Sequence, residues 1–196
     1  MRNETSVQRR AVRFSRDDAQ RAGDAWGFNC GPGALCAVLD MTPDEIRPHL
    51  GDFEPKGYVN PSLMGGILRG LNVPHDWRVL CTDGRHETPT ALAPAWPRFG
   101  LVRIQWDGPW CDPGRPIRAR YRHTHWVAHR VHQLLAVPNK DLDVGQVFDV
   151  NAMCVGGWLA VEEWIAALVP WLLQEVEPKS SGGWWMTHVV ELTADS

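Results

Sequence analysis

Apolar residues along the chain change from a helical to a strand-like spacing at about residue 71. Before that point they recur three and four positions apart, as on one face of a helix, in stretches that follow Asn29, Thr42 and Asn60. Each of these polar residues can cap the first turn of a helix through its side-chain oxygen. The pattern therefore predicts three helices, the last of which should stop at Gly70.

Two of the helix starts carry further signals. The first helix should begin at Cys30, with Pro32 in the first turn, where a missing backbone N–H costs nothing. The second start, Thr42–Glu45, reads as a capping box with proline at the first helical position, and this helix should end near Gly51. Residues 1–23 precede these signals and are interpreted as an N-terminal arm of irregular structure.

Beyond residue 71 the apolar residues form short runs separated by loops rich in proline and glycine. The predicted strands are Trp77–Leu80, Leu101–Trp106, Arg122–Val131, Val147–Val150 and Trp185–Leu192. A last helix should cover Val161–Leu168 and be ended or kinked by Pro170. Helices first and antiparallel strands afterwards are typical of the α+β class, so we expect a single domain over residues 24–196.

Composition narrows the function classes. The chain has 196 residues and a formal net charge of −3, which gives no strong field toward nucleic acid. No apolar run approaches the ~20 residues that span a bilayer, and the polar N-terminal stretch does not read as a signal peptide. Five cysteines without a C-x-x-C spacing argue against a disulfide framework or a zinc ribbon. We therefore expect a reducing, cytoplasmic setting, with no nucleic-acid or membrane partner and no cofactor.

Tryptophan is unusually abundant, with 11 residues against 2 tyrosines. These rings either fill a core that is short of other large side chains or line a binding groove. If there is a groove, the candidates for its walls are Trp26, Trp110 and Trp126, together with the tryptophans at positions 106, 158, 184 and 185.

Cys30 is the best candidate for a reactive thiol. It stands at the predicted start of a helix, where aligned peptide dipoles favour a thiolate, and the small residues Gly31 and Gly33 leave its sulfur open. The alternative is a buried, inert cysteine, as expected for Cys36 further along the same helix.

A thiolate nucleophile needs a base, and the base needs a group that orients it. Three histidines of one predicted strand, at positions 123, 125 and 129, share a face, so alternation alone does not select among them. The apolar run after His125 favours that residue because it would fix the imidazole within a central strand. Asp149 ends the next apolar strand and could fix the tautomer of the base, with Asn151 as the second choice.

These three segments resemble the Cys, His and Asp boxes of the papain-like cysteine peptidase superfamily, and most closely those of C39-like peptidases. The similar stretches are Asn29–Leu35 (NCGPGAL), His125–Val127 (HWV) and Phe148–Asn151 (FDVN), in the family's chain order. The whole chain is also similar to uncharacterised proteins encoded in bacteriophages and prophages. The resemblance implies a papain-like fold and a thiol-dependent hydrolase or acyl-transferase whose substrate is a peptide or protein, with Cys30, His125 and Asp149 as its catalytic residues.

One position departs from the family pattern. The family places a glutamine six residues before the nucleophile to complete the oxyanion hole, and this chain has Asp24 there, whose charge would repel an oxyanion. Gln20 could take the role if the intervening loop bulges. Otherwise the donors would be the Cys30 backbone N–H together with Trp26 or Asn29.

Other functions fit parts of the same pattern. Without a working oxyanion hole, the fold could serve as a phage-encoded binding or inhibitor protein, in the host cytoplasm. A peptidoglycan amidase or endopeptidase of the wider superfamily is a further alternative. His123 and His125 could also bind a metal with Cys111, Asp149 or Cys154 as third ligand, although an H-x-H pair is a weak signal by itself and we expect no metal.

Overall fold

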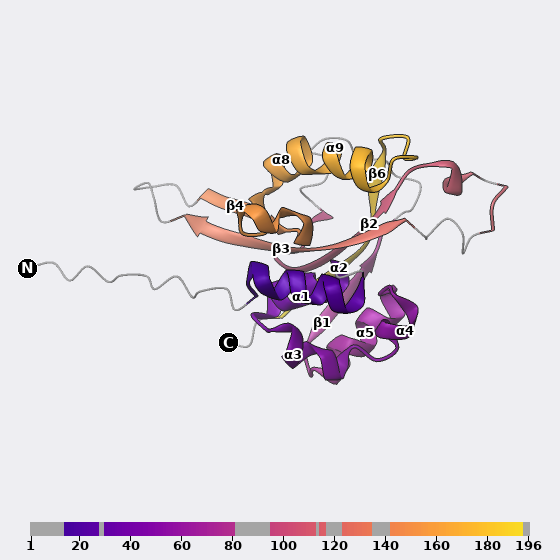
Figure 1. Cartoon of the computed structure of the whole chain (residues 1–196). Helices are drawn as coiled ribbons and strands as arrows, with labels where there is room; N and C mark the ends of the chain where they lie inside the picture. Colours follow the sequence, from indigo (N-terminus) through magenta and orange to yellow (C-terminus); the bar gives the residue numbers. More distant parts are fainter. Residues whose placement is uncertain are drawn as a thin grey trace, which may run out of the picture.

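The computed structural model describes residues 14–27, 30–80, 95–112, 114–116, 123–134 and 142–193. Within these residues a six-stranded antiparallel sheet lies between two layers of helices (Figure 1). The strands are β1 (His75–Val79), β2 (Phe99–Trp106), β3 (Thr124–Leu134), β4 (Leu142–Phe148), β5 (Trp158–Ala160) and β6 (Trp184–Leu192), in the order β1-β6-β2-β3-β4-β5. The predicted α+β class is confirmed.

The N-terminal helices cover one face of the sheet (Figure 1). They are α1 (Arg16–Trp26), α2 (Cys30–Leu39), α3 (Pro43–Ile46), α4 (Phe53–Lys56) and α5 (Pro61–Gly70), with a 3₁₀ turn at Arg47–His49. α2 is the central helix of this layer, and its residues 31–38 are all buried. It packs on β3, where Trp126 and Ala128 face it from the sheet. The start of α2 is therefore held firmly against the strand that carries the candidate base.

The predicted helix starts are confirmed by their caps. The Thr42 hydroxyl accepts from the Glu45 N–H (3.3 Å), and the Glu45 carboxylate accepts from the Thr42 N–H (2.8 Å). The Asn60 side chain accepts from the Leu63 N–H (2.8 Å) at the start of α5. α2 begins at Cys30 as expected, and Asn29 lies outside the described residues. α3 is shorter than predicted because Pro48 has no N–H to continue an α-helical ladder.

α1 overlaps the arm predicted for residues 1–23. Ser15 caps this helix in a capping box with Asp18, and the side chains of Phe14, Ala19 and Ala22 are buried against the domain. The helix escaped prediction because it turns mainly small alanines toward the core, so its sequence lacks the large apolar residues that mark a helical face. The described part of the predicted arm belongs to the domain.

The C-terminal helical segment covers the opposite face of the sheet (Figure 1). It runs through α8 (Val161–Glu163), a π-helical stretch (Trp164–Leu168), α9 (Val169–Trp171) and a second π-helical stretch (Leu172–Val176). The prediction that Pro170 ends or kinks the helix at Leu168 is wrong about the end, because the helical turns continue beyond it. Wider π turns lie on both sides of Pro170, and such turns occur where the regular ladder of hydrogen bonds is interrupted.

Most of the tryptophans fill the core. The rings at positions 96, 106, 126, 164, 184 and 185 are buried, and only Trp171 has a large exposed fraction, 45%. Trp126, proposed as a groove wall, is 2% exposed, and its indole N–H donates to the Val59 carbonyl (2.7 Å). It therefore holds the α4–α5 connection against the sheet and presents no open surface. Trp26 and Trp110 remain partly exposed.

Candidate active site

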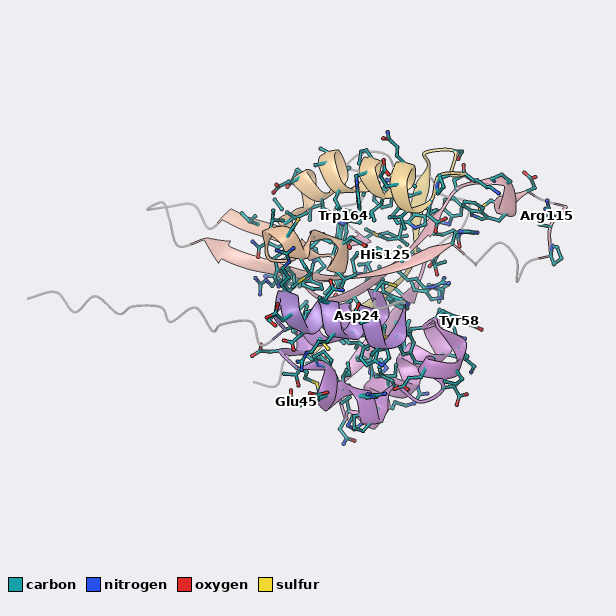
Figure 2. All side chains as sticks on the ribbon, viewed as in Figure 1. Asp24, Glu45, Tyr58, Arg115, His125 and Trp164 are labelled. Carbon is teal, nitrogen blue, oxygen red and sulfur yellow. The ribbon has the colours of Figure 1, made fainter. Side chains whose placement is uncertain are left out.

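The three predicted catalytic residues come together where β3 extends past the end of β4. Pairing of these strands runs from Leu134↔Leu142 to Ala128↔Phe148, so the first residues of β3, including His125, lie beyond the end of β4. Asp149 follows directly at that end. α2 approaches the same place, since a Cβ on Gly33 would lie 3.4 Å from the Val150 side chain. Figure 2 shows His125 in the middle of the molecule, between the two helical layers.

Asp149 is a fully buried carboxylate that accepts four hydrogen bonds. Its Oδ2 accepts from His125 Nε2 (2.9 Å) and from the Trp164 indole N–H (3.0 Å). Its Oδ1 accepts from the backbone N–H and the side-chain amide of Asn151, both at 2.9 Å. Burial by itself would raise the pKa of Asp149, but the charge of His125 and these hydrogen bonds lower it. The carboxylate is therefore ionised and fixed in orientation.

His125 is buried and has partners on both sides of its ring. Nε2 faces Asp149, which leaves Nδ1 for the hydrogen bond with the Cys30 side chain. The ring of Trp106 stacks on the imidazole, with 6.1 Å between the ring centroids and 25° between the planes. Burial opposes protonation, but the charge and hydrogen bond of Asp149 outweigh it and raise the pKa of His125 to about 10. His125 is therefore held as an imidazolium near neutral pH.

Cys30 is the first residue of α2 and is partly exposed. Burial would raise the pKa of its thiol, but the hydrogen bond and charge of His125 and a hydrogen bond with the Trp126 backbone lower it below the usual value. Cys36 lies further along α2, and its pKa shifts in the opposite direction. Burial raises the pKa of its thiol to about 12. The pKa values of the two cysteines of α2 thus shift in opposite directions.

The neighbouring histidines of β3 have different partners. His123 pairs with Glu177 (2.6 Å between Nδ1 and the carboxylate) and stacks on Trp110, with ring centroids 3.7 Å apart. His129 contacts the Pro97 carbonyl through Nδ1 (2.5 Å), and burial lowers its pKa to about 4. Asp149 therefore distinguishes His125 from the other two. Among the described residues no group of three or more His, Cys, Asp or Glu side chains is placed to hold a metal ion.

The remaining site residues named from the sequence lie in varied places. The Gln20 side-chain amide donates to Asp24 (2.8 Å), and both side chains are exposed on α1. Gln20 is therefore engaged with Asp24, the residue six positions before Cys30. Asn151 contacts Asp149 rather than the imidazole, so it supports the orienting carboxylate. Trp26 packs edge-on against Phe53, with 5.6 Å between the ring centroids.

Comparisons with protein-family models, with curated proteins and with solved structures found no match. None of the described helices combines the length and the apolar character that a membrane span requires. The functional interpretation of this chain accordingly depends on its own geometry.

Trp164 is the site residue that the sequence did not reveal. It begins the first π-helical stretch and is fully buried, and its indole N–H donates a hydrogen bond to Asp149. π turns often occur at functional positions. No sequence pattern links a tryptophan in a C-terminal helix to a carboxylate that ends a strand, so only the fold discloses the contact.

Replacing Trp164 by phenylalanine should destabilise the protein by about 2 kcal/mol, because a hydrogen bond to a charged, buried group is lost. The pKa of Asp149 should rise, and the acid limb of any pH–rate profile should move upward with it. Urea unfolding and that profile measure the two effects. Trp171→Phe, on the exposed side of the same segment, is the matched control and should change neither. Equal stability of the two variants would contradict the role of the indole N–H.

Proposed function

We propose that the protein is a papain-like, thiol-dependent hydrolase or acyl-transferase that acts on a peptide or other amide bond. The observation that carries this proposal is the continuous chain of contacts from Cys30 through His125 to the buried Asp149. The order of helices before sheet, with the thiol at a helix start, supports the papain-like interpretation. Cys30 would be the nucleophile, His125 the acid and base, and Asp149 the orienting group.

The first half-reaction follows from the charges at the site. The Cys30 thiolate attacks the substrate carbonyl carbon, a C–S bond forms, and the carbonyl electrons move onto oxygen. As the carbonyl re-forms and the C–N bond breaks, His125 gives its Nδ1 proton to the leaving amine. The products of this step are the free amine and a thioester on Cys30, with a neutral imidazole beside it.

The second half-reaction restores the enzyme. Neutral His125 takes a proton from water, whose oxygen attacks the thioester carbonyl, and the C–S bond breaks to release a carboxylic acid. The proton stays on the imidazole and the thiolate returns. An amine in place of water would give acyl transfer with the same proton movements. Asp149 keeps Nε2–H oriented throughout and stays ionised.

When the thiolate attacks, the substrate carbonyl oxygen becomes negatively charged and needs hydrogen-bond donors to stabilise it. The start of α2 offers such donors. The first backbone N–H groups of a helix have no partner within the helix, and its dipole adds positive potential there. The N–H groups of Cys30 and Gly31 belong to this first turn. A larger residue at position 31 would have to displace Val59, since a Cβ there would lie 2.8 Å from its side chain. We propose backbone donors in place of the family's glutamine.

The pH dependence of alkylation tests the proposal directly. The rate of iodoacetamide labelling at Cys30 should reach half its plateau at a pH below the ~8.5 of an ordinary thiol, because His125 lowers the pKa. Turnover should also fall above about pH 10, where the imidazolium is lost. Labelling in urea provides the control, since the unfolded chain should show the ordinary thiol pKa. A native half-plateau at or above ~8.5 would contradict the proposal.

A non-catalytic binding protein with the same fold is the second candidate. The exposed Gln20–Asp24 pair favours it, because neither side chain is available as an oxyanion donor. This alternative requires that the unmodified protein cleaves no peptide or peptidoglycan substrate, even if Cys30 is the cysteine that iodoacetamide labels selectively. Digestion of purified cell walls would instead identify a peptidoglycan amidase or endopeptidase.

A further inference from the structure

Trp106 lies beside His125 on the same face of the sheet. His125 is directly opposite Ile104 on β2, and Trp106 follows two residues later, so its side chain points to the same side. Such diagonal neighbours are within reach of each other when one of them is aromatic. The two rings are 6.1 Å apart between centroids and inclined by 25°, as in offset stacking. Trp106 is also buried, so the contact is shielded from water.

The backbone on both sides of the Trp106 side chain is held by hydrogen bonds. Its N–H donates to the His123 carbonyl (3.0 Å). Its own carbonyl accepts from the Gln105 side-chain amide (2.9 Å) and from the Trp110 indole N–H (2.8 Å). The Trp110 ring stacks in turn on His123, with ring centroids 3.7 Å apart. The indole of Trp106 is therefore a fixed surface against which the catalytic imidazole rests.

The two hydrogen bonds of the His125 ring leave one motion weakly restrained. Nε2 faces Asp149 and Nδ1 faces Cys30, so both nitrogens have fixed positions. A tilt of the ring about the line between the nitrogens would misalign both N–H directions, and hydrogen bonds weaken as they bend. A ring stacked on one face opposes that tilt, because the imidazole atoms would be driven into it. The indole face also carries negative potential, which attracts an imidazolium.

The titratable groups that act on His125 are Asp149, at the end of β4, and Cys30, at the start of α2. β2 presents the uncharged ring of Trp106. We propose that Trp106 is a positioning residue for His125, whose stacked indole keeps the imidazole aligned with Asp149 and Cys30 and stabilises its positive charge. This inference rests on the proposed function and extends it to the regulation of the site by pH. Trp106 then helps to set the highest pH at which the thiolate–imidazolium pair persists.

Two substitutions of Trp106 separate its aromatic face from its bulk. Trp106→Leu removes the aromatic face, Trp106→Phe keeps one, and both shorten the side chain, so they share any loss of packing. NMR titration of the His125 ring C–H signal, assigned with His125→Ala, should show the wild-type imidazolium losing its proton at about pH 10. In Trp106→Leu this titration should move down by about 0.5–1.5 pH units, as expected for a lost buried cation–π contact. In Trp106→Phe it should move by less than half as much. Equal titrations in the two variants would refute the role of the ring.

Trp96→Leu is the matched control. Trp96 is a buried tryptophan that also stacks on a histidine, with 4.8 Å between its ring centroid and that of His129. Its loss should leave the His125 titration unchanged, and a shift as large as that of Trp106→Leu would mean a general loss of packing and overturn the proposal. If Trp106→Leu does not fold, Trp106→Met takes its place, since methionine is apolar and adapts to irregular gaps.

The failure of this inference differs from the failure of the proposed function. If iodoacetamide does not label wild-type Cys30 selectively, the proposed function fails, while the NMR titration still measures what Trp106 does to His125. If labelling is selective but Trp106→Leu titrates as the wild type does, the thiol chemistry stands and Trp106 has no positioning role.

Discussion

Replacing Cys30 by alanine is expected to lower turnover on the order of 10⁴-fold or more and to remove iodoacetamide labelling near neutral pH. The reason is that the nucleophile is lost while the rest of the site has no group that can form the covalent intermediate. The fold should survive, because the side chain is small and lies at the start of α2 rather than inside it. Mass spectrometry of the labelled peptides identifies the modified cysteine.

Cys36 and Cys154 provide the controls for this experiment. Cys36 is buried in α2 with its thiol pKa raised to about 12, so Cys36→Ala should leave the labelling rate unchanged. Cys154 is exposed, and Cys154→Ala should likewise leave the labelling rate of Cys30 unchanged. Selective, fast labelling of either residue in place of Cys30 would overturn the assignment of the nucleophile.

The helix starts could be predicted from the sequence because each depends on residues that are close together in the chain. The starts of α2, α3 and α5 depend on a cap, a proline at the first turn and the apolar stripe behind them, all of which lie within a few residues of each other. The ends were less predictable: Pro170 fits within a helical segment whose π turns and packing against the sheet no sequence rule anticipates. β5 was missed because a strand of three residues carries no measurable alternation.

The candidate site could likewise be predicted only where a signal in the neighbouring residues marks a position. Cys30 could be singled out by its helix start, and Asp149 by its place at a strand end. Alternation alone does not distinguish His125 from His123 or His129, whereas the 2.9 Å contact between His125 and Asp149 does. The contact between Trp164 and Asp149 depends on long-range packing, which residue patterns do not encode locally.

Substitution of Asp149 should have the second large effect, on stability as well as on activity. All four groups that hydrogen-bond to the Asp149 carboxylate are donors. An asparagine at this position would replace one carboxylate oxygen by an NH₂ group, which is itself a donor and cannot accept from the donors that it faces. Asp149→Asn should therefore cost about 3–5 kcal/mol of unfolding free energy, as expected when one partner of a buried charge pair is removed. Activity should fall on the order of 10²–10⁴-fold, because the imidazole loses its fixed tautomer.

The pH dependence of the lost unfolding free energy distinguishes an effect of charge from poorer packing of the core. The raised pKa of His125 contributes stability that is fully present below about pH 6.5 and is lost as the pH rises through about 10. The lowered pKa of Asp149 contributes stability above about pH 4, which is lost as the pH falls through its native value. Urea unfolding should therefore show the widest gap between wild type and Asp149→Asn near pH 5–6, narrowing toward pH 10.

Asn151→Ala is the matched control for Asp149→Asn, since it removes one neutral donor from the same carboxylate and leaves its charge in place. Its cost should be about 1 kcal/mol and nearly independent of pH between 5 and 10, because the His125–Asp149 pair persists. A stability gap for Asp149→Asn that stays constant over this range would mean that the carboxylate is held by packing alone. The imidazolium would then lack its counter-charge, and with it the means to hold Cys30 as a thiolate.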